Sequence, residues 1–151
     1  MKKTKKNSVW GTRMNKAVSS VLQNANASIE IDKRLFQEDI NGSIAHCTML
    51  AKQKIIDLKK SKRIIAGLKK IEQEILKNKF TFETKHEDIH LNVEKRLFAI
   101  IGADAGFLHT ARSRNDQVTT DFKLWIKKSS NEIKSLIHVL IKSFLNLADK
   151  N

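Results

Sequence analysis

The chain has 151 residues and a net charge of +13, with 29 Lys and Arg against 16 Asp and Glu. Its single cysteine, Cys47, excludes an internal disulfide framework and is typical of a reducing cytoplasm, where we expect it to be a small buried side chain. No apolar run reaches the roughly 18 residues that span a membrane, and the basic N-terminus is not followed by the apolar part of a secretory signal.

The positive charge is concentrated in two blocks. Residues 1–16 carry six Lys and Arg and no acid, and residues 52–79 carry ten Lys and Arg against three acids. A basic tail and a basic helix could bind nucleic acid. The second block has no interleaved aromatic side chains, and the chain has no nucleic-acid-binding motif. A solvated lysine-rich surface is therefore the preferred interpretation.

The first part of the chain predicts a loop followed by a helix. Residues 1–8 are expected to form a disordered basic tail, and Trp10 a packing anchor. Residues 24–28 lack regular spacing and are predicted to form a loop. Asp32 is the expected N-cap of a helix that extends to about Gln53, because apolar residues recur there at helical spacing.

The following segments predict a helical hairpin and a third helix. Residues 54–56 read as a short connection, and Asp57 as the N-cap of a helix that ends near Asn78. Two antiparallel helices joined by a short loop form a helical hairpin. A third helix is expected over residues 86–101, ended by Gly102 as its C-terminal cap. The predicted fold class is therefore all-α.

The start of this third helix contains a zinc-binding pattern. His86-Glu87-Asp88-Ile89-His90 matches H-E-x-x-H, in which two histidines one helical turn apart hold zinc and the glutamate acts as base. The segment is charged on both sides, whereas a metal-binding helix is normally held in an apolar layer. A zinc hydrolase is kept as a third hypothesis, and a structural role for His90 is the simpler interpretation.

Residues 115–148 predict one uninterrupted helix with an apolar stripe near heptad spacing. At 1.5 Å per residue such a helix is about 50 Å long, which is too long for a small monomeric domain. The two earlier helices cannot cover all of its apolar surface. Residues 133–147 should therefore pack on further chain, on other subunits, or on both.

The turn before this helix carries an unusual set of polar residues. Ser113 can cap the helix, and Asp116 suits both a capping box and the helix dipole. Capping does not explain Arg112, Arg114 or Asn115. Guanidinium groups beside the free N–H groups of a helix N-terminus form a good site for a carboxylate or phosphate. The spacing alone leaves capping and anion binding as equal alternatives.

Three segments resemble a known family. LHTARSRNDQVTTDFKLW, residues 108–125, resembles a signature of argininosuccinate lyase, which belongs to the fumarase/aspartase superfamily; Ala111 replaces the usual glycine. NASIEIDKRL, residues 26–35, and EDIHLNVEKRL, residues 87–97, resemble two further segments in the expected order. VWGTRM near the N-terminus resembles the family's W-G-G-R-F opening with two departures.

The resemblance implies both a reaction and a set of binding residues. Argininosuccinate lyase cleaves argininosuccinate to arginine and fumarate by β-elimination, with no cofactor or metal, as a cytoplasmic homotetramer. The substrate-binding residues implied for this chain are Ser28, Asp88, His90, Arg114 and Asn115. The sequence does not decide whether Asp88 faces the substrate's guanidinium group or orients His90.

The resemblance also implies what this chain lacks. The family's general acid and base lie in a T-H pair and a G-S-S-x-M-P-x-K loop, and neither occurs before Asn151. The expected parts are a tail over residues 1–8, an N-terminal helical domain over 9–112, and the first long helix of a central bundle over 113–151. By itself this chain is expected to be inactive. The alternative function is a non-catalytic helical remnant or a basic module for nucleic-acid binding or assembly.

Overall fold

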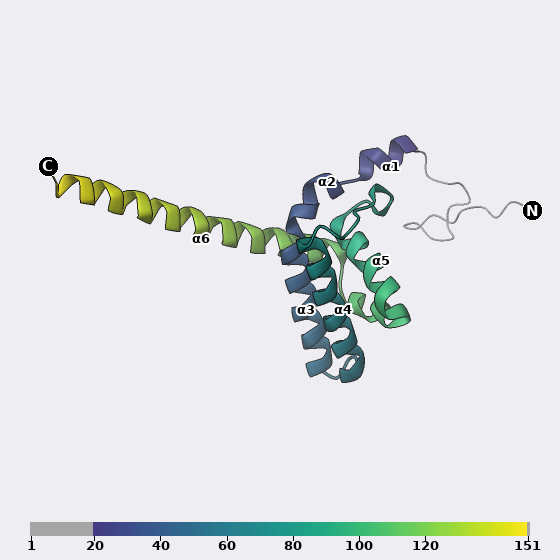
Figure 1. The fold of residues 1–151 in the computed structure, drawn as a ribbon. Coiled ribbons are helices and arrows are strands. Elements are labelled where there is room, and N and C mark those ends of the chain that lie inside the picture. The colour runs from purple at the N-terminus through teal and green to yellow at the C-terminus, as the bar shows by residue number, and fades with distance from the viewer. Residues whose placement is uncertain (1–19, 151) are drawn as a thin grey trace, which may run out of the picture.

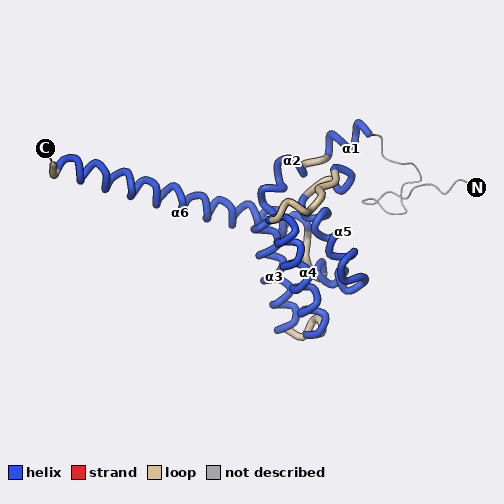
Figure 2. Tube along the Cα trace, viewed as in Figure 1, coloured by secondary structure: helices blue, strands red, loops and turns tan. Residues whose placement is uncertain are grey.

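The computed structural model describes residues 20–150, and these residues form helices and connecting turns without any strand. The predicted basic tail and the Trp10 segment lie outside the described residues. In chain order the elements are α1 (Ser20–Asn26), α2 (Ile29–Asp32), a 3-10 turn (Lys33–Leu35), α3 (Phe36–Lys52), α4 (Leu58–Leu76), a 3-10 turn (Thr84–His86), α5 (Ile89–Ile101), a 3-10 segment (Gly102–His109) and α6 (Arg114–Ala148). Figures 1 and 2 show α3, α4 and α5 gathered in one body, from which α6 projects. The all-α prediction is confirmed.

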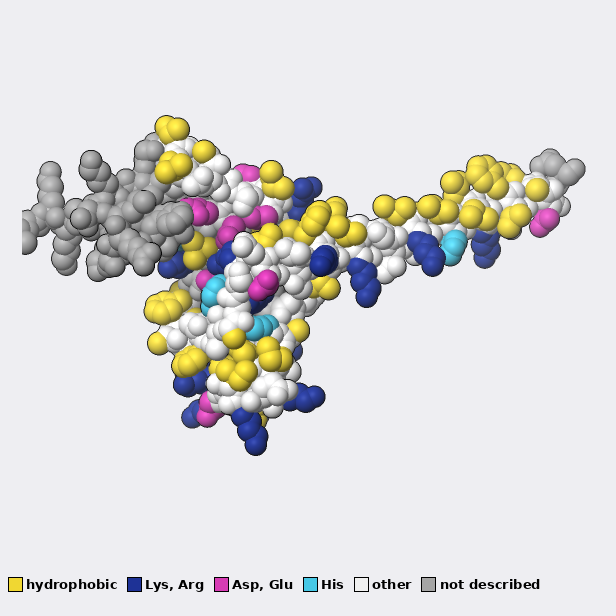
Figure 3. Space-filling model, turned by 180° about the vertical axis from the view of Figure 1, so that it is seen from behind, with side chains coloured by type: hydrophobic (Ala, Val, Ile, Leu, Met, Phe, Trp, Pro, Cys, Tyr) yellow, Lys and Arg dark blue, Asp and Glu magenta, His cyan; other side chains and the backbone are white. Residues whose placement is uncertain are grey.

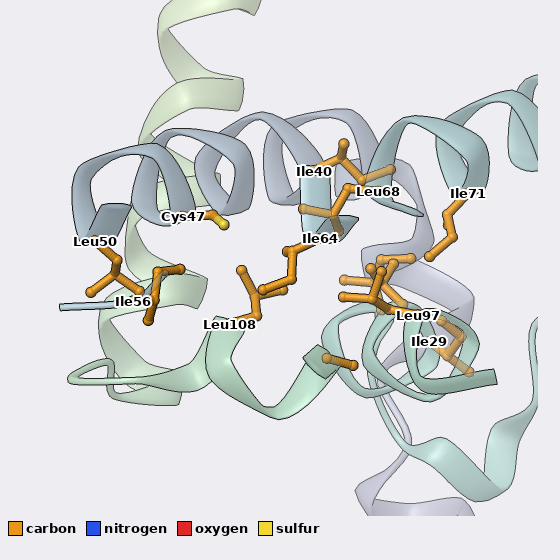
Figure 4. Packing of buried hydrophobic residues seen from close by; sticks show 13 residues of the cluster. Ile29, Ile40, Cys47, Leu50, Ile56, Ile64, Leu68, Ile71, Leu97 and Leu108 are labelled. Atoms are coloured by element: carbon orange, nitrogen blue, oxygen red, sulfur yellow. The ribbon is translucent and has the colours of Figure 1, made fainter. Parts of the chain in front are cut away.

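Helices α3 and α4 form the predicted helical hairpin. Asp57 is the N-cap of α4, and its side chain accepts a hydrogen bond of 2.6 Å from the Lys59 N–H. Apolar side chains from α3, α4, α5 and the segment that follows α5 are buried together in one core (Figure 4). Burial of these stripes supplies the main stabilisation of the helices, because short helices are marginal in isolation.

Helix α5 packs closely against α4 at a glycine. A Cβ atom built on Gly67 would lie 2.5 Å from Cδ1 of Leu97, so any larger residue here would force the Leu97 side chain to move. Gly102 ends α5 with φ +70°, and its N–H bonds to the Phe98 carbonyl, as predicted for a C-terminal cap. Helix α5 begins at Ile89, three residues later than expected.

The structure corrects two predictions near the start of the chain. Asn24–Asn26, predicted as loop, belong to α1. Asp32 does not cap the long helix, because α3 begins only at Phe36, after a 3-10 turn. The Asp32 carboxylate instead accepts hydrogen bonds from Ser28 Oγ at 2.6 Å and from the Ile89 N–H at 3.1 Å. Asp32 therefore bonds to the start of α5, far away in the sequence, instead of capping the helix that follows it.

Helix α6 turns a polar side, not its apolar stripe, toward the body. Gln117 and Asp121 are buried against α3, while Phe122 remains 52% exposed. Farther along, every large apolar side chain from Ile133 to Leu147 is at least 50% exposed. Figure 3 shows apolar side chains along one edge of this helix and basic side chains along the opposite edge. Nothing within residues 20–150 covers the stripe, as expected for its C-terminal half.

Among residues 20–150, no helix combines the length and the apolar composition that crossing a membrane requires.

Candidate functional site

Two of the three segments singled out in the sequence are joined by backbone hydrogen bonds. The N–H groups of Ser28 and Ile29 both bond to the Glu87 carbonyl at 2.9 Å. The Ile89 N–H returns a bond to the Asp32 side chain. The start of α2 and the start of α5 are therefore held together, although about sixty residues separate them in the sequence.

The third segment, at the start of α6, contacts the start of α5 through the Arg114 side chain. Nε of Arg114 lies 3.7 Å from Oδ2 of Asp88, and Nη2 lies 2.9 Å from Oε1 of Glu94. Arg114 is the first residue of α6, and its side chain is 30% exposed. The first turn of α6 thus lies against the first two turns of α5, and all three segments converge at one site.

Asp88 has a structural task in addition to its ion pair with Arg114. It is the N-cap of α5, and its Oδ1 accepts a hydrogen bond of 2.6 Å from the Leu91 N–H. The preceding residue, Glu87, has φ +57°, a left-handed conformation that is costly for a side chain of this kind. This kink, together with the cap, starts α5 at Ile89 and directs the second Asp88 oxygen toward Arg114.

Asn115 and Ser28 offer exposed polar groups at the edge of the site. The Ser113 side chain caps α6 by accepting a 3.2 Å hydrogen bond from the Asn115 N–H, which confirms the predicted cap. The Asn115 side chain is exposed and makes no hydrogen bond to other residues of the described range. The Ser28 hydroxyl is exposed and donates to Asp32. Burial, and to a lesser degree the nearby Asp88, raises the pKa of Asp32 against the effect of this hydrogen bond.

His90 lies beneath the site. It is 2% exposed, and its Nδ1 lies 2.9 Å from Oδ1 of Asp39 in α3 and 3.5 Å from Oδ2 of Asp121 in α6. Both carboxylates are fully buried. Of the five residues assigned to substrate binding, His90 is thus the one that the structure places inside the protein, and its contact with substrate stays a prediction.

Burial and charge act against each other in this group. Burial lowers the pKa of His90, but the hydrogen bond and charge of Asp39 outweigh it and leave the pKa raised. Burial raises the pKa of Asp39, but the hydrogen bond from His90 and the charges around it leave that pKa lowered. Asp121 has no such donor; burial and then the charge of Asp39 raise its pKa to about 7. The buried group therefore takes up or releases a proton near neutral pH.

The sequence analysis did not identify Asp39, Gln117 or Asp121. A signal was present for the α3 residue, because Asp39, Ser43 and Cys47 follow one another at four-residue spacing on the side of α3 that is buried. Gln117 and Asp121 are likewise four residues apart. The apolar stripe of α6 is the stronger signal in the sequence, and it obscured this polar pair.

The zinc pattern does not form on one helix. His86 ends the 3-10 turn that precedes α5, and the left-handed Glu87 separates it from His90, which lies in the first turn of the helix. The two histidines therefore do not face one another across a helical turn, and the geometry on which the H-E-x-x-H interpretation depends is missing.

Comparison with known proteins agrees with the resemblance seen in the sequence. A family model described as lyase matches residues 12–151. The chain is 56% identical over 152 residues to the argininosuccinate lyase of Pelagibacter ubique (strain HTCC1062), covering all of this chain and 33% of that protein. It is 51% and 49% identical over 146 residues to the argininosuccinate lyases of Ehrlichia chaffeensis (strain ATCC CRL-10679 / Arkansas) and Ehrlichia canis (strain Jake), covering 97% of this chain and 31% of each relative. The chain thus spans about a third of the length of these curated relatives, and a nucleic-acid-binding or assembly module is not favoured.

Proposed function

The chain belongs to the lyase family, and from this premise we propose that it is the N-terminal third of an argininosuccinate lyase, which cleaves argininosuccinate to arginine and fumarate. The observation that carries the proposal is the convergence of three segments at one site. Ser28 and Asp88 are linked through the Glu87 carbonyl and the Asp32 side chain, and Arg114 pairs with Asp88.

The proposed reaction needs fixed hydrogen-bond donors beside a carboxylate. In a β-elimination a base removes a proton next to a carboxylate, so negative charge grows on its oxygens in the transition state. Donors that are already in place stabilise that charge without reorganisation. Asn115 and the guanidinium of Arg114 lie at the N-terminus of α6, where the helix dipole also favours an anion. We assign these two residues to a substrate carboxylate.

The remaining assignments follow from exposure and charge. The Ser28 hydroxyl lies at the edge of the site, where it can donate to a second substrate carboxylate. Asp88 is paired with Arg114 at 3.7 Å, so we propose that it orients this guanidinium and can also face the cationic part of the substrate. His90 is the fifth residue assigned to substrate binding, and it lies buried beneath the other four.

The rest of the active site comes from outside residues 1–151 in this proposal. We place the general acid and base in the part of the enzyme that corresponds to the other two thirds of the relatives. We also propose that α6 is the first helix of a central bundle in a cytoplasmic homotetramer, where the exposed stripe from Ile133 to Leu147 is buried between helices.

The isolated chain is expected to release no fumarate from argininosuccinate, because we place the acid and base outside residues 1–151. Fumarate can be followed by its ultraviolet absorbance. The positive control is a completed enzyme, in which this chain replaces the matching third of the Pelagibacter ubique lyase; it is expected to turn over. Sustained turnover by the isolated chain would contradict the division of the active site, and an inactive but folded tetrameric hybrid would contradict the proposed function.

Replacing Asn115 with alanine in the completed enzyme is expected to lower kcat/KM by about 100- to 1,000-fold, the usual cost of one preorganised donor to a developing anion. The Asn115 side chain makes no bond within residues 20–150, so its removal should leave the thermal unfolding midpoint unchanged. Gln53→Ala is the matched control, because Gln53 is an exposed amide at the opposite end of α3. Equal activity of the two variants would remove Asn115 from the site.

A further inference from the structure

The buried group beneath the site joins three helices that are far apart in the sequence. Asp39 comes from α3, His90 from the first turn of α5, and Asp121 from the second turn of α6. One ligand-type atom from each lies within 4.8 Å of the others, and all three side chains are at most 2% exposed. Such burial of two carboxylates is costly unless their charges are compensated.

The hydrogen bonding of this group is incomplete. His90 Nδ1 can donate one proton, and Asp39 Oδ1 receives it at 2.9 Å while Asp121 Oδ2 lies at 3.5 Å. Oδ2 of Asp39 and both oxygens of Asp121 are buried without a partner among the described residues. A proton on Asp121 would satisfy the pair, because a protonated carboxyl can donate to the neighbouring carboxylate.

A bound cation fits this group less well than a proton. The positive charge of Arg112 acts on both Asp39 and Asp121, and the charge of His90 acts on both as well. A divalent ion would lie beside these two cations and would compete with the imidazole N–H for the same oxygens. His90 and Arg112 already compensate most of the negative charge of Asp39 and Asp121, so the group needs at most one further proton.

A chain of hydrogen bonds connects the buried group to the surface of the site. Gln117 Nε2 donates to Asp39 Oδ1 at 2.5 Å, and its Oε1 accepts from Arg114 Nη1 at 2.5 Å. Gln117 is itself 3% exposed, so it has little freedom to change partners. Arg114 continues the chain to Asp88 and Glu94. The Gln117 side-chain amide thus links the buried Asp39 to the Arg114 guanidinium and fixes the position of that guanidinium.

We propose that Asp39, His90 and Asp121 form a buried proton-holding centre that positions Arg114 through Gln117 and makes the binding of an anionic substrate at the start of α6 depend on pH. This inference rests on the proposed function, since Arg114 is taken to meet a substrate carboxylate. The three residues are positioning residues, because they act through Gln117 and Arg114 and do not touch the reacting atoms.

The direction of the pH dependence follows from the charges that face the centre. On the α6 side these are Arg112, in the turn before the helix, and Arg114. The other elements contribute Asp39 of α3, His90 and Glu94 of α5 with Asp88 at its N-cap, and Asp32 of α2. Asp121 holds its proton below about pH 7 and loses it above. The lost proton leaves a second negative charge beneath Arg114, which attracts the guanidinium inward and repels an incoming carboxylate. Substrate should therefore bind more weakly on the alkaline side.

The first test compares the KM for argininosuccinate of the completed enzyme and its Asp121→Asn variant across neutral pH. The wild-type KM is expected to rise roughly fivefold as Asp121 ionises, whereas the variant, which mimics the protonated carboxyl, should show no rise. Gln117→Leu should give a raised KM with the same flat profile, because the connection to Arg114 is cut. Gln53→Leu is its control and should follow the wild-type curve. Parallel profiles for wild type and Asp121→Asn would overturn the proposal.

The second test does not depend on activity. In the chain of residues 1–151, the carboxyl carbon resonance of Asp121, assigned by its loss in Asp121→Asn, is expected to titrate near pH 7. Titration near the ordinary value of about 4 would overturn the proton-holding centre even if the enzyme is active. An inactive hybrid with a resonance that titrates near neutral pH would instead contradict the proposed function and leave the centre in place.

Discussion

Replacing Leu97 with alanine is expected to lower the free energy of unfolding by about 2–5 kcal/mol, the usual range for deleting a fully buried leucine side chain. Leu97 is 0% exposed, and its side chain fills the space over Gly67, between α4 and α5. Truncating Leu97 therefore empties the space over Gly67 and leaves a cavity between the two helices. Urea unfolding followed by circular dichroism measures the change.

Leu76→Ala is the matched control for this experiment. It removes the same atoms from the last residue of α4, where the leucine is 53% exposed. Its cost should stay below about 1 kcal/mol, because little apolar surface is returned to water. An equal loss of unfolding free energy in the two variants would show that the packing of Leu97 between α4 and α5 does not stabilise the fold more than an exposed leucine does.

Replacing Asp39 with asparagine is expected to cost about 3 kcal/mol near pH 5.5, because it removes the carboxylate that is hydrogen-bonded to the buried His90 imidazolium. The 2.9 Å bond between the two is nearly free of solvent. The amide can still accept a hydrogen bond, so the fold should persist while its stability falls. Thermal or urea unfolding at several pH values measures the loss.

The loss is expected to depend on pH in a defined window. The pKa of Asp39 is lowered from 3.8, so its contribution to stability is present above that value and is lost as pH falls through the folded-state pKa. The pKa of His90 is raised from 6.5, so its contribution is present below that value and is lost as pH rises through the folded-state pKa. The difference between wild type and Asp39→Asn should therefore be greatest between 3.8 and 6.5 and smaller on either side.

Glu30→Gln provides the control for the charge change. Glu30 pairs with Lys33 at 2.6 Å, but its side chain is 76% exposed, and exposed ion pairs contribute at most about 1 kcal/mol. A pH-independent loss in Asp39→Asn, or an equal loss in Glu30→Gln, would show that the buried pair is not charged in the folded protein.

Local patterns were sufficient where the stabilising partner lies nearby in the sequence. The Asp57 and Ser113 caps and the Gly102 stop were predicted because each acts within one helical turn. The bounds of α3 and α5 were less accurate. Asp32 and Glu87 looked like ordinary residues of a helix start, but both take part in the contact between α2 and α5. A partner about sixty residues away leaves no local signal.

The sequence by itself determined the four long helices α3 to α6, the order of the three segments and the residues at the start of α6, because periodicity, caps and motif spacing are local properties. Only the tertiary structure decided which side of α6 faces the body. Gln117 and Asp121 are buried there and Phe122 is not, because Asp39 and His90 offer partners to a polar side. The apolar stripe was the stronger signal in the sequence, and it lies on the surface because nothing within residues 20–150 covers it. Burial of a polar group depends on the partner that three-dimensional packing brings to it, and hydropathy along one helix does not contain that information.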